Sequence, residues 1–123
     1  MQVPGGWVTP WLDTSFGDGG LVTTDVGGAQ DYGEAVALGR ADAIIVAGKA
    51  DSGTVYDLAL ARYTSDGSLD PSFGTGGLII VDFHGSGDTA EDVAIQPDDG
   101  RIVAGGYTGN GSDTEFALVR IGP

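Results

Sequence analysis

Aromatic side chains set close to aspartates and asparagines are the residues of this 123-residue sequence best suited to binding chemistry. Tyrosine and tryptophan offer a large apolar ring together with a polar tip, and neighbouring carboxylates accept hydrogen bonds. This combination fits carbohydrate recognition by stacking and hydrogen bonding, and equally fits rings that simply cover a core. The candidate ligand-binding residues are Trp7, Trp11, Tyr32, Tyr56, His84 and Tyr107.

Two carboxylate pairs recur with the same three-residue spacing, Asp31 with Glu34 and Asp88 with Glu91. Carboxylate oxygens are the ligands that Ca²⁺ prefers, so the four residues are candidates for a calcium site. The alternative is that the aspartates cap turns through their side chains. No EF-hand loop is present, and beyond possible Ca²⁺ we expect no cofactor.

The charge balance excludes several classes of partner. The net charge is −13, with only five lysines and arginines. Binding to nucleic acids or to anionic membranes needs basic patches, so neither partner is expected. There is no cysteine, and no apolar run approaches the roughly 18 residues of a membrane span. No signal peptide is visible, as would also be true of a mature secreted fragment.

One phrase occurs twice and organises the chain. Leu-Asp-Thr-Ser-Phe-Gly at 12–17 returns as Leu-Asp-Pro-Ser-Phe-Gly at 69–74, an offset of 57 residues. About half of the positions in residues 12–48 are identical at this offset, which indicates internal duplication. The sequence therefore divides into three parts. They are an N-terminal arm at 1–11, a first repeat at 12–68 and a second repeat at 69–123.

Each repeat contains four short strand-like runs separated by turn residues, which predicts an all-β fold with almost no helix. We name the runs d, a, b and c in chain order. The sequence 96–100 is a strong hairpin turn, and the degraded sequence 39–43 predicts a looser one. The predicted strands are 21–25, 34–38, 44–48 and 58–63 in the first repeat, and 78–82, 91–96, 101–106 and 116–121 in the second.

The ordered motifs of both repeats resemble the delta-60 repeat. They are the L-D-x-S-F-G-x-G-G phrase, a strand ending in Asp, the A-V-A…D-G-R-I-V-A-G segment and F-A-L-x-R, over residues 12–121. The first repeat departs from this pattern at 40–43. The resemblance implies two four-stranded β-propeller blades in a bacterial protein, often secreted or at the cell surface. It carries no established catalytic residues.

In a propeller, strand a lies nearest the central channel and strand d lies at the rim, so by this resemblance the chain has the permuted order d-abc-d-abc. The first strand d has no earlier strand c, and the last a, b and c have no following strand d. An unpaired edge invites pairing with another chain. We therefore expect residues 12–25 of one copy to complete the sheet built from residues 91–121 of another.

Two blades cannot close a ring, because propellers have about four to eight blades. Head-to-tail contacts close only as cyclic rings, so the chain is expected to form a homo-oligomer. A trimer with six blades is preferred and a tetramer with eight is second. The alternatives are a fragment of a longer propeller and an open or intertwined sandwich of the two units.

Arg62 and Arg120 lie on apolar strand faces, where an unpaired charge would be costly. The candidate partners for both arginines are Asp13 and Asp70, the aspartates of the recurring phrase.

The sequence favours a non-enzymatic module that self-assembles and serves as a scaffold or as a binding platform for a glycan or a protein. The binding face is expected on the loops 26–33, 49–57, 83–90 and 106–115. The alternative is a metal-assisted hydrolase or lyase acting on a polysaccharide at the channel face. His84, the only histidine, could act there as a general base with Asp82 or Asp88, but the sequence favours a histidine in a surface loop.

Overall fold

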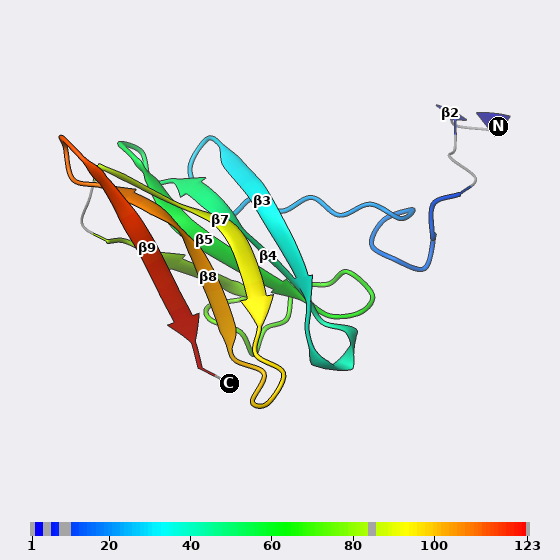
Figure 1. Cartoon of the computed structure of the whole chain (residues 1–123). Coiled ribbons are helices and arrows are strands. Elements are labelled where there is room, and N and C mark those ends of the chain that lie inside the picture. The colour runs from blue at the N-terminus through cyan, green and yellow to red at the C-terminus, as the bar shows by residue number, and fades with distance from the viewer. Residues whose placement is uncertain (1, 4–5, 8–10, 84–85, 123) are drawn as a thin grey trace.

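The computed structural model describes residues 2–3, 6–7, 11–83 and 86–122, and these form an all-β protein with no α-helix. Two antiparallel sheets make up the body of the molecule, and a short hairpin lies near the N-terminus (Figure 1). The hairpin pairs β1 (Gln2–Val3) with β2 (Gly6–Trp7). The remaining strands are β3 (Asp31–Leu38), β4 (Ile44–Asp51), β5 (Tyr56–Tyr63), β6 (Leu78–Val81), β7 (Gly87–Ile95), β8 (Ile102–Gly109) and β9 (Thr114–Ile121).

The first sheet has four strands in the order β3-β4-β5-β6, as predicted for a complete a-b-c-d unit. β5 is a central strand, because it pairs with β4 along its whole length and with β6 through Leu58–Val81 to Ala61–Leu78. Both edges of β5 are therefore paired, and its Leu58 and Leu60 are fully buried in the core.

The second sheet has only three strands, β7-β8-β9, and β9 is its edge. The predicted strand at 21–25 is wrong for the single copy, because that segment forms only the isolated bridge between Asp18 and Leu21. A strand needs a partner for its backbone groups. The corresponding segment β6 has β5 beside it, whereas no strand of the described chain pairs with 21–25.

The core lies between the two sheets, which pack against each other through β7. Leu58, Leu60 and Ile45 from the first sheet meet Ala90 and Val93 from β7, and Phe73 closes one side. Burying such side chains contributes about 1.5–3 kcal/mol each, so this layer is the main stabilising contact between the two sheets.

A β-bulge near the start of strand a occurs in both repeats, between Gly33 and Ala35 and between Ala90 and Asp92. A glycine stands opposite each bulge because the backbones approach closely. A Cβ on Gly106 would lie 2.0 Å from the Thr89 carbonyl oxygen. The bulges extend β3 and β7 by several residues beyond the predicted strands and carry Asp31 and Asp88 from the expected loops into strands.

The two a–b turns differ as the sequence predicts. The second turn uses Gly100 at a positive φ of 74°. The first turn contains the 3₁₀ segment η1 (Arg40–Asp42), in which Ala41 and Asp42 have φ values of 56° and 60°. The sequence of the first turn lacks the glycine of the second, so two non-glycine residues adopt the left-handed backbone conformation, which is energetically unfavourable for them.

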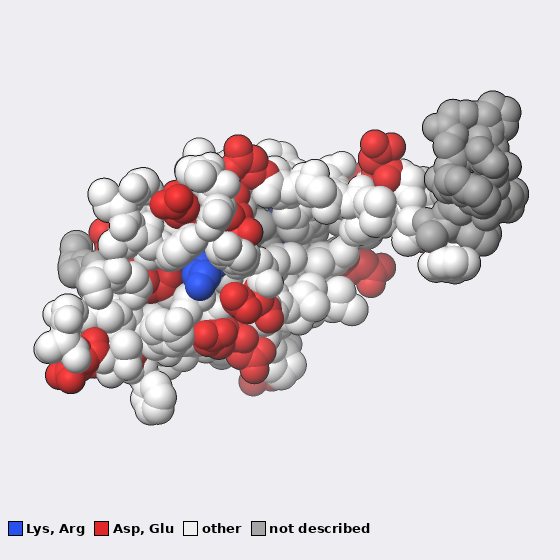
Figure 2. Space-filling view, turned by 90° about the horizontal axis from the view of Figure 1, so that it is seen from above, with Lys and Arg blue, Asp and Glu red and all other residues white. Residues whose placement is uncertain are grey.

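The surface carries the acidity of the sequence. Figure 2 shows carboxylates spread over the visible face among few basic groups. No helix in the described part of the chain is long and apolar enough to cross a membrane.

Candidate functional site

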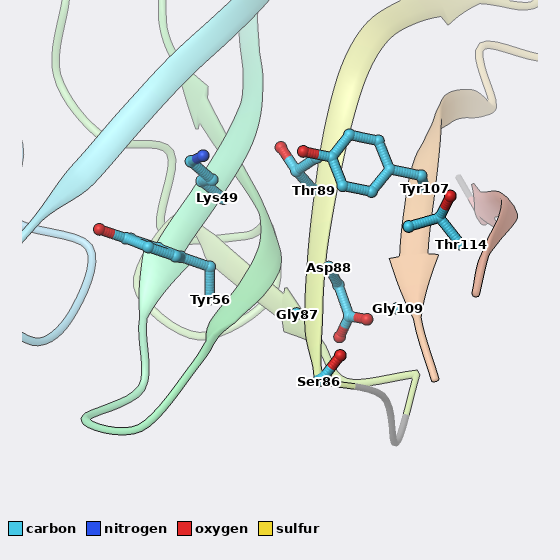
Figure 3. A pocket seen from close by; sticks show the side chains of 9 residues that line it. All are labelled: Lys49, Tyr56, Ser86, Gly87, Asp88, Thr89, Tyr107, Gly109 and Thr114. Atoms are coloured by element: carbon cyan, nitrogen blue, oxygen red, sulfur yellow. The ribbon is translucent and has the colours of Figure 1, made fainter. Parts of the chain in front are cut away.

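A pocket of about 200 Å³ lies at the end of the molecule where β5 and β7 begin and β8 ends (Figure 3). Lys49 and Tyr56 from the first sheet line one side, and Tyr107 and Thr114 from the second sheet line the other. Asp88 and Thr89 of β7 lie between them. The pocket therefore brings together two of the predicted aromatic residues and one of the predicted carboxylates.

The tyrosines on the first-sheet side form a cluster around Lys49. The rings of Tyr32 and Tyr56 meet edge to face with centroids 5.9 Å apart, and Lys49 Nζ lies 5.2 and 4.8 Å from the two centroids. Both hydroxyls donate to Gln30 Oε1, at 3.0 and 2.9 Å. Burial, and then the neighbouring Tyr32, raises the pKa of Tyr56, so its hydroxyl stays protonated and donates.

The other aromatic candidates stand apart from this cluster or outside the described structure. Trp11 is 80% exposed, so its indole does not cover the core in the single copy. Trp7 lies in β2, but its side chain is outside the described part, as is the whole of His84. Tyr32, Tyr56 and Tyr107 were expected in loops and lie instead on strands β3, β5 and β8, because these strands are longer than predicted.

Of the four predicted metal ligands, the two aspartates hold backbone N–H groups of the preceding loop. Asp31 Oδ2 accepts from the Val26 N–H at 2.8 Å, and Asp88 Oδ2 accepts from the Phe83 N–H at 3.0 Å. This is the turn-capping role. Glu34 and Glu91 are exposed on their strands.

Asp88 also belongs to a group of three carboxylates that sequence reasoning did not assemble. One oxygen of each of Asp57, Asp82 and Asp88 lies within 4.8 Å of the others. Asp57 and Asp88 are buried, and Asp82 is exposed. Burial, followed by the charges of Asp82 and Asp88, raises the pKa of Asp57.

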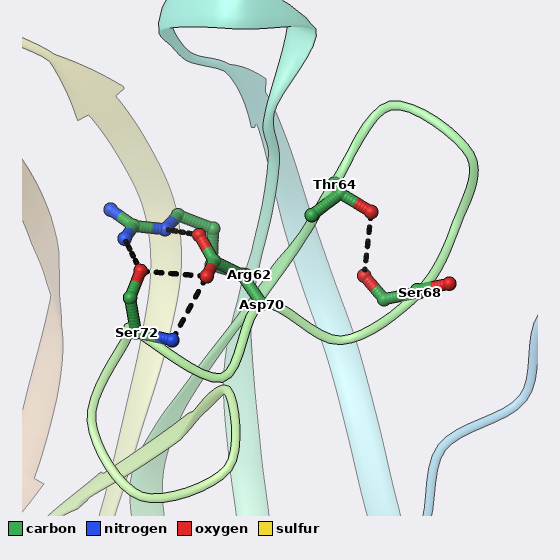
Figure 4. Close-up of polar contacts among 5 residues, drawn as sticks. All are labelled: Arg62, Thr64, Ser68, Asp70 and Ser72. Atoms are coloured by element: carbon green, nitrogen blue, oxygen red, sulfur yellow. Dashed lines mark hydrogen bonds and ion pairs between the residues drawn. The ribbon is translucent and has the colours of Figure 1, made fainter.

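The predicted partner of Arg62 is confirmed. Arg62 Nε donates to Asp70 Oδ2 at 2.9 Å, and Ser72 donates to Asp70 Oδ1 (Figure 4). The Ser72 hydrogen bonds, and then the Arg62 charge, hold the pKa of Asp70 below its ordinary value. The guanidinium also lies 4.5 Å from the centroid of Phe73. This cluster fixes the corner that leads from β5 into β6.

Within one copy, Arg120 pairs with neither of the two candidate aspartates. Arg120 instead donates to Gln96 Oε1 at 3.4 Å. Asp13 keeps the serine partner that its counterpart Asp70 has, since Ser15 Oγ donates to Asp13 Oδ1 at 2.6 Å. The corner at 12–21 is thus built like the corner at 69–78, but without its arginine.

Residues 43–73 and 98–123 match the family described as "Domain of unknown function (DUF5122) beta-propeller". The two matched segments contain the β4–β5 and β8–β9 hairpins, which are corresponding parts of the two repeats. The all-β fold and this match together support a β-propeller-type repeat, while the narrower resemblance to the delta-60 repeat stays a prediction. No curated protein and no solved structure matches the chain.

Proposed function

We propose that the chain is a non-enzymatic propeller module, in which each copy completes the blade of the next by strand exchange. The segment 21–24 of one copy would pair with β9 of its neighbour, as β6 pairs with β5 within the chain. Three copies would then give a closed ring of six blades, within the known range of propellers. The ring would serve as a rigid scaffold that presents its loops and strand ends to a ligand.

The observation that carries this proposal is the contrast between corresponding residues of β5 and β9. Leu58 and Leu60 are fully buried, whereas their counterparts at an offset of 58 residues are Phe116, which is fully exposed, and Leu118, which is 71% exposed. β9 therefore presents both an unpaired backbone edge and an apolar face. Uncovered edges of this kind are sites for pairing with a further strand.

The corner that precedes the exchanged segment is already formed in the single copy. The Phe16 N–H donates to the Asp13 carbonyl and the Gly20 N–H to the Phe16 carbonyl, at 3.1 and 2.8 Å. The corresponding bonds of the second corner, from Phe73 and Gly77, have the same lengths. A preformed corner loses less conformational entropy on binding, which favours the exchange.

The position of this segment favours exchange between copies over closure within one copy. The Gly17 N–H donates to the Asp66 carbonyl at 2.8 Å, and the Thr24 and Tyr63 hydroxyls lie 2.6 Å apart. These contacts hold the segment on the first sheet, on the side of the molecule away from β9 (Figure 1). In the ring, the same exchange would bring Asp13 to Arg120, as Asp70 meets Arg62 within the chain.

The mass of the particle in solution tests the assembly. Light scattering after gel filtration is expected to give about three times the 12.4 kDa chain mass. The mass should stay constant on dilution until the ring dissociates, because a closed ring satisfies every edge. A stable single chain at all concentrations would contradict the proposal, and a four-copy particle would favour the eight-bladed alternative.

We further propose that the pocket of Tyr56, Tyr107 and Lys49 binds a glycan. The pocket offers aromatic rings beside hydrogen-bonding side chains, which is the chemistry that sugars require. A protein ligand is the other candidate for the same platform. The location at a bacterial cell surface is part of this proposal and rests on the delta-60 resemblance alone.

Glycan binding can be tested with two substitutions of Tyr107, one that removes its aromatic ring and one that keeps it. A glycan array is expected to reveal at least one ligand, and Tyr107→Ala should weaken its binding about tenfold because an aromatic stacking surface is lost. Tyr107→Phe keeps the ring and should stay within about threefold of the parent protein. An empty array, or equal binding by Tyr107→Ala, would contradict the glycan assignment and leave a protein ligand as the candidate.

The enzymatic alternative has less support. A metal-assisted hydrolase or lyase would need an acid–base pair, and the sequence offered only His84 with Asp82 or Asp88 for that role. His84 lies outside the described residues.

A further inference from the structure

Three carboxylates from three different strand ends meet at the junction of the two sheets. Asp57 is the second residue of β5, Asp82 directly follows β6, and Asp88 is the second residue of β7. Leu58 of β5 pairs with Val81 of β6, so the adjacent residues Asp57 and Asp82 lie side by side at the end of this pair of strands. β7 packs on β5 from the second sheet and brings Asp88 to them.

Asp57 has a buried oxygen that no donor of the described residues contacts. Its residue is 9% exposed, and its Oδ1 has no hydrogen-bond partner in the described structure. Asp88, at 2% exposed, is different, because its Oδ2 accepts from the Phe83 N–H and its Oδ1 from the Thr108 hydroxyl. A buried carboxylate oxygen without a donor is strongly unfavourable unless a cation or a proton compensates it.

No basic side chain of the described chain supplies that compensation for Asp57 or Asp88. The two ion pairs within the described residues join Arg62 to Asp70 and Arg101 to Asp99, and neither involves Asp57 or Asp88. Lys49, which pairs with Leu58 next to Asp57 in the sheet, has its Nζ over the tyrosine rings. Within the described residues, Asp57 and Asp88 therefore lie close together without a basic side chain that pairs with either of them.

We propose that Asp57, Asp82 and Asp88 bind one divalent cation, with Ca²⁺ as the ion that fits best. The donor set consists of carboxylate oxygens, which hard cations prefer, and the chain has no cysteine for softer metals. Calcium–oxygen bonds are about 2.3–2.6 Å long, so two oxygens on one ion lie up to about 5 Å apart. The separation of at most 4.8 Å between the three oxygens meets this condition.

The rest of the coordination shell would come from solvent. Calcium takes about six to eight oxygens, and three carboxylates supply only part of them. Asp82 is exposed and Asp88 lines the pocket beside Ser86, so water and the ion reach the junction from that side (Figure 3). Bound there, the ion would tie β5, β6 and β7 together and stiffen the contact between the repeats. Because all three residues belong to one chain, the site does not depend on ring assembly.

Calorimetric titration of the chelator-treated protein with CaCl₂, together with thermal unfolding, tests this site. We expect binding of one ion at the junction and a Tm increase of about 5 °C or more at saturating calcium. Asp57→Asn, a near-isosteric change, should weaken calcium binding at least tenfold and abolish the Tm increase. Asp82→Asn provides a second variant at an exposed position, and it should also weaken binding. Asp98→Asn removes the same charge from the exposed turn at the other end of β7 and should bind like the parent protein.

The competing explanation is that Asp57 simply carries a proton. In that case calcium up to about 10 mM, above the Kd range of weak extracellular calcium modules, would give no heat and no Tm shift. Asp57→Asn would then unfold at the same temperature as the parent with or without calcium. Either that result, or unchanged calcium binding by both Asp57→Asn and Asp82→Asn, would overturn the proposal.

Discussion

Phe116→Asp is expected to convert the particle from about three copies to a single folded chain. In one copy Phe116 is fully exposed, so the substitution should change the free energy of unfolding of that copy by no more than about 0.5 kcal/mol. In the ring the residue would take the place that Leu58 has in the chain, fully buried against the next sheet. A charge buried there costs several kcal/mol, enough to dissociate the interface.

The measurement is light scattering of both proteins at the same concentration, with circular dichroism to show that the fold is kept. Thr75→Asp is the matched control, because it adds the same charge at an exposed corner position whose counterpart in the first repeat is already Asp18. It should assemble like the parent protein. If Phe116→Asp keeps the mass of the parent particle, β9 is not the assembly face and the exchange model is wrong.

The sequence predicts the body of both sheets because their residues alternate or repeat in a way that local physics explains. The strands b and c and the turn at 96–100 appear in the structure close to their predicted positions, and Arg62 pairs with Asp70. The segment 21–25 differs because strand formation depends on a partner strand and not on the segment alone. Its repeat β6 forms a strand with a similar sequence only because β5 lies beside it.

The candidate sites were harder to predict because the strands begin earlier than their patterns suggest. Each bulge inserts a residue and shifts the inward-facing positions, so residues before it no longer follow the alternation that marks a strand. Asp88 therefore looked like a loop residue and is buried in β7. A usable signal existed, since Asp82 and Asp88 recur as Asp25 and Asp31, and Asp57 corresponds to the acidic Glu115. Only the sheet packing shows that three such positions converge.

Oxidation of the double variant Thr23→Cys with Ala117→Cys is expected to give a covalent particle of three chains. The partner residues Ala59 and Ile80 stand opposite each other on β5 and β6. At the repeat offsets these correspond to Ala117 and Thr23, so the exchange places the two positions in register on neighbouring copies. Opposed residues of antiparallel strands have Cα atoms about 4.5–5.5 Å apart, within the range that a disulfide spans. The parent chain has no cysteine to interfere.

A denaturing gel without reductant distinguishes the possible assemblies. A closed ring uses both cysteines of every copy, so one band at three chain masses should appear and collapse to a single chain on reduction. A ladder extending beyond that band would mean an open chain of copies, and a band at four masses would correct the copy number while keeping the exchange. Ala59→Cys with Ile80→Cys should cross-link within one chain and add no mass. Thr23→Cys with Leu118→Cys points the second thiol to the other face of β9 and should cross-link poorly. Equal cross-linking by both Thr23 pairs would show that the segment contacts β9 without the register of β6, and therefore not as the missing fourth strand.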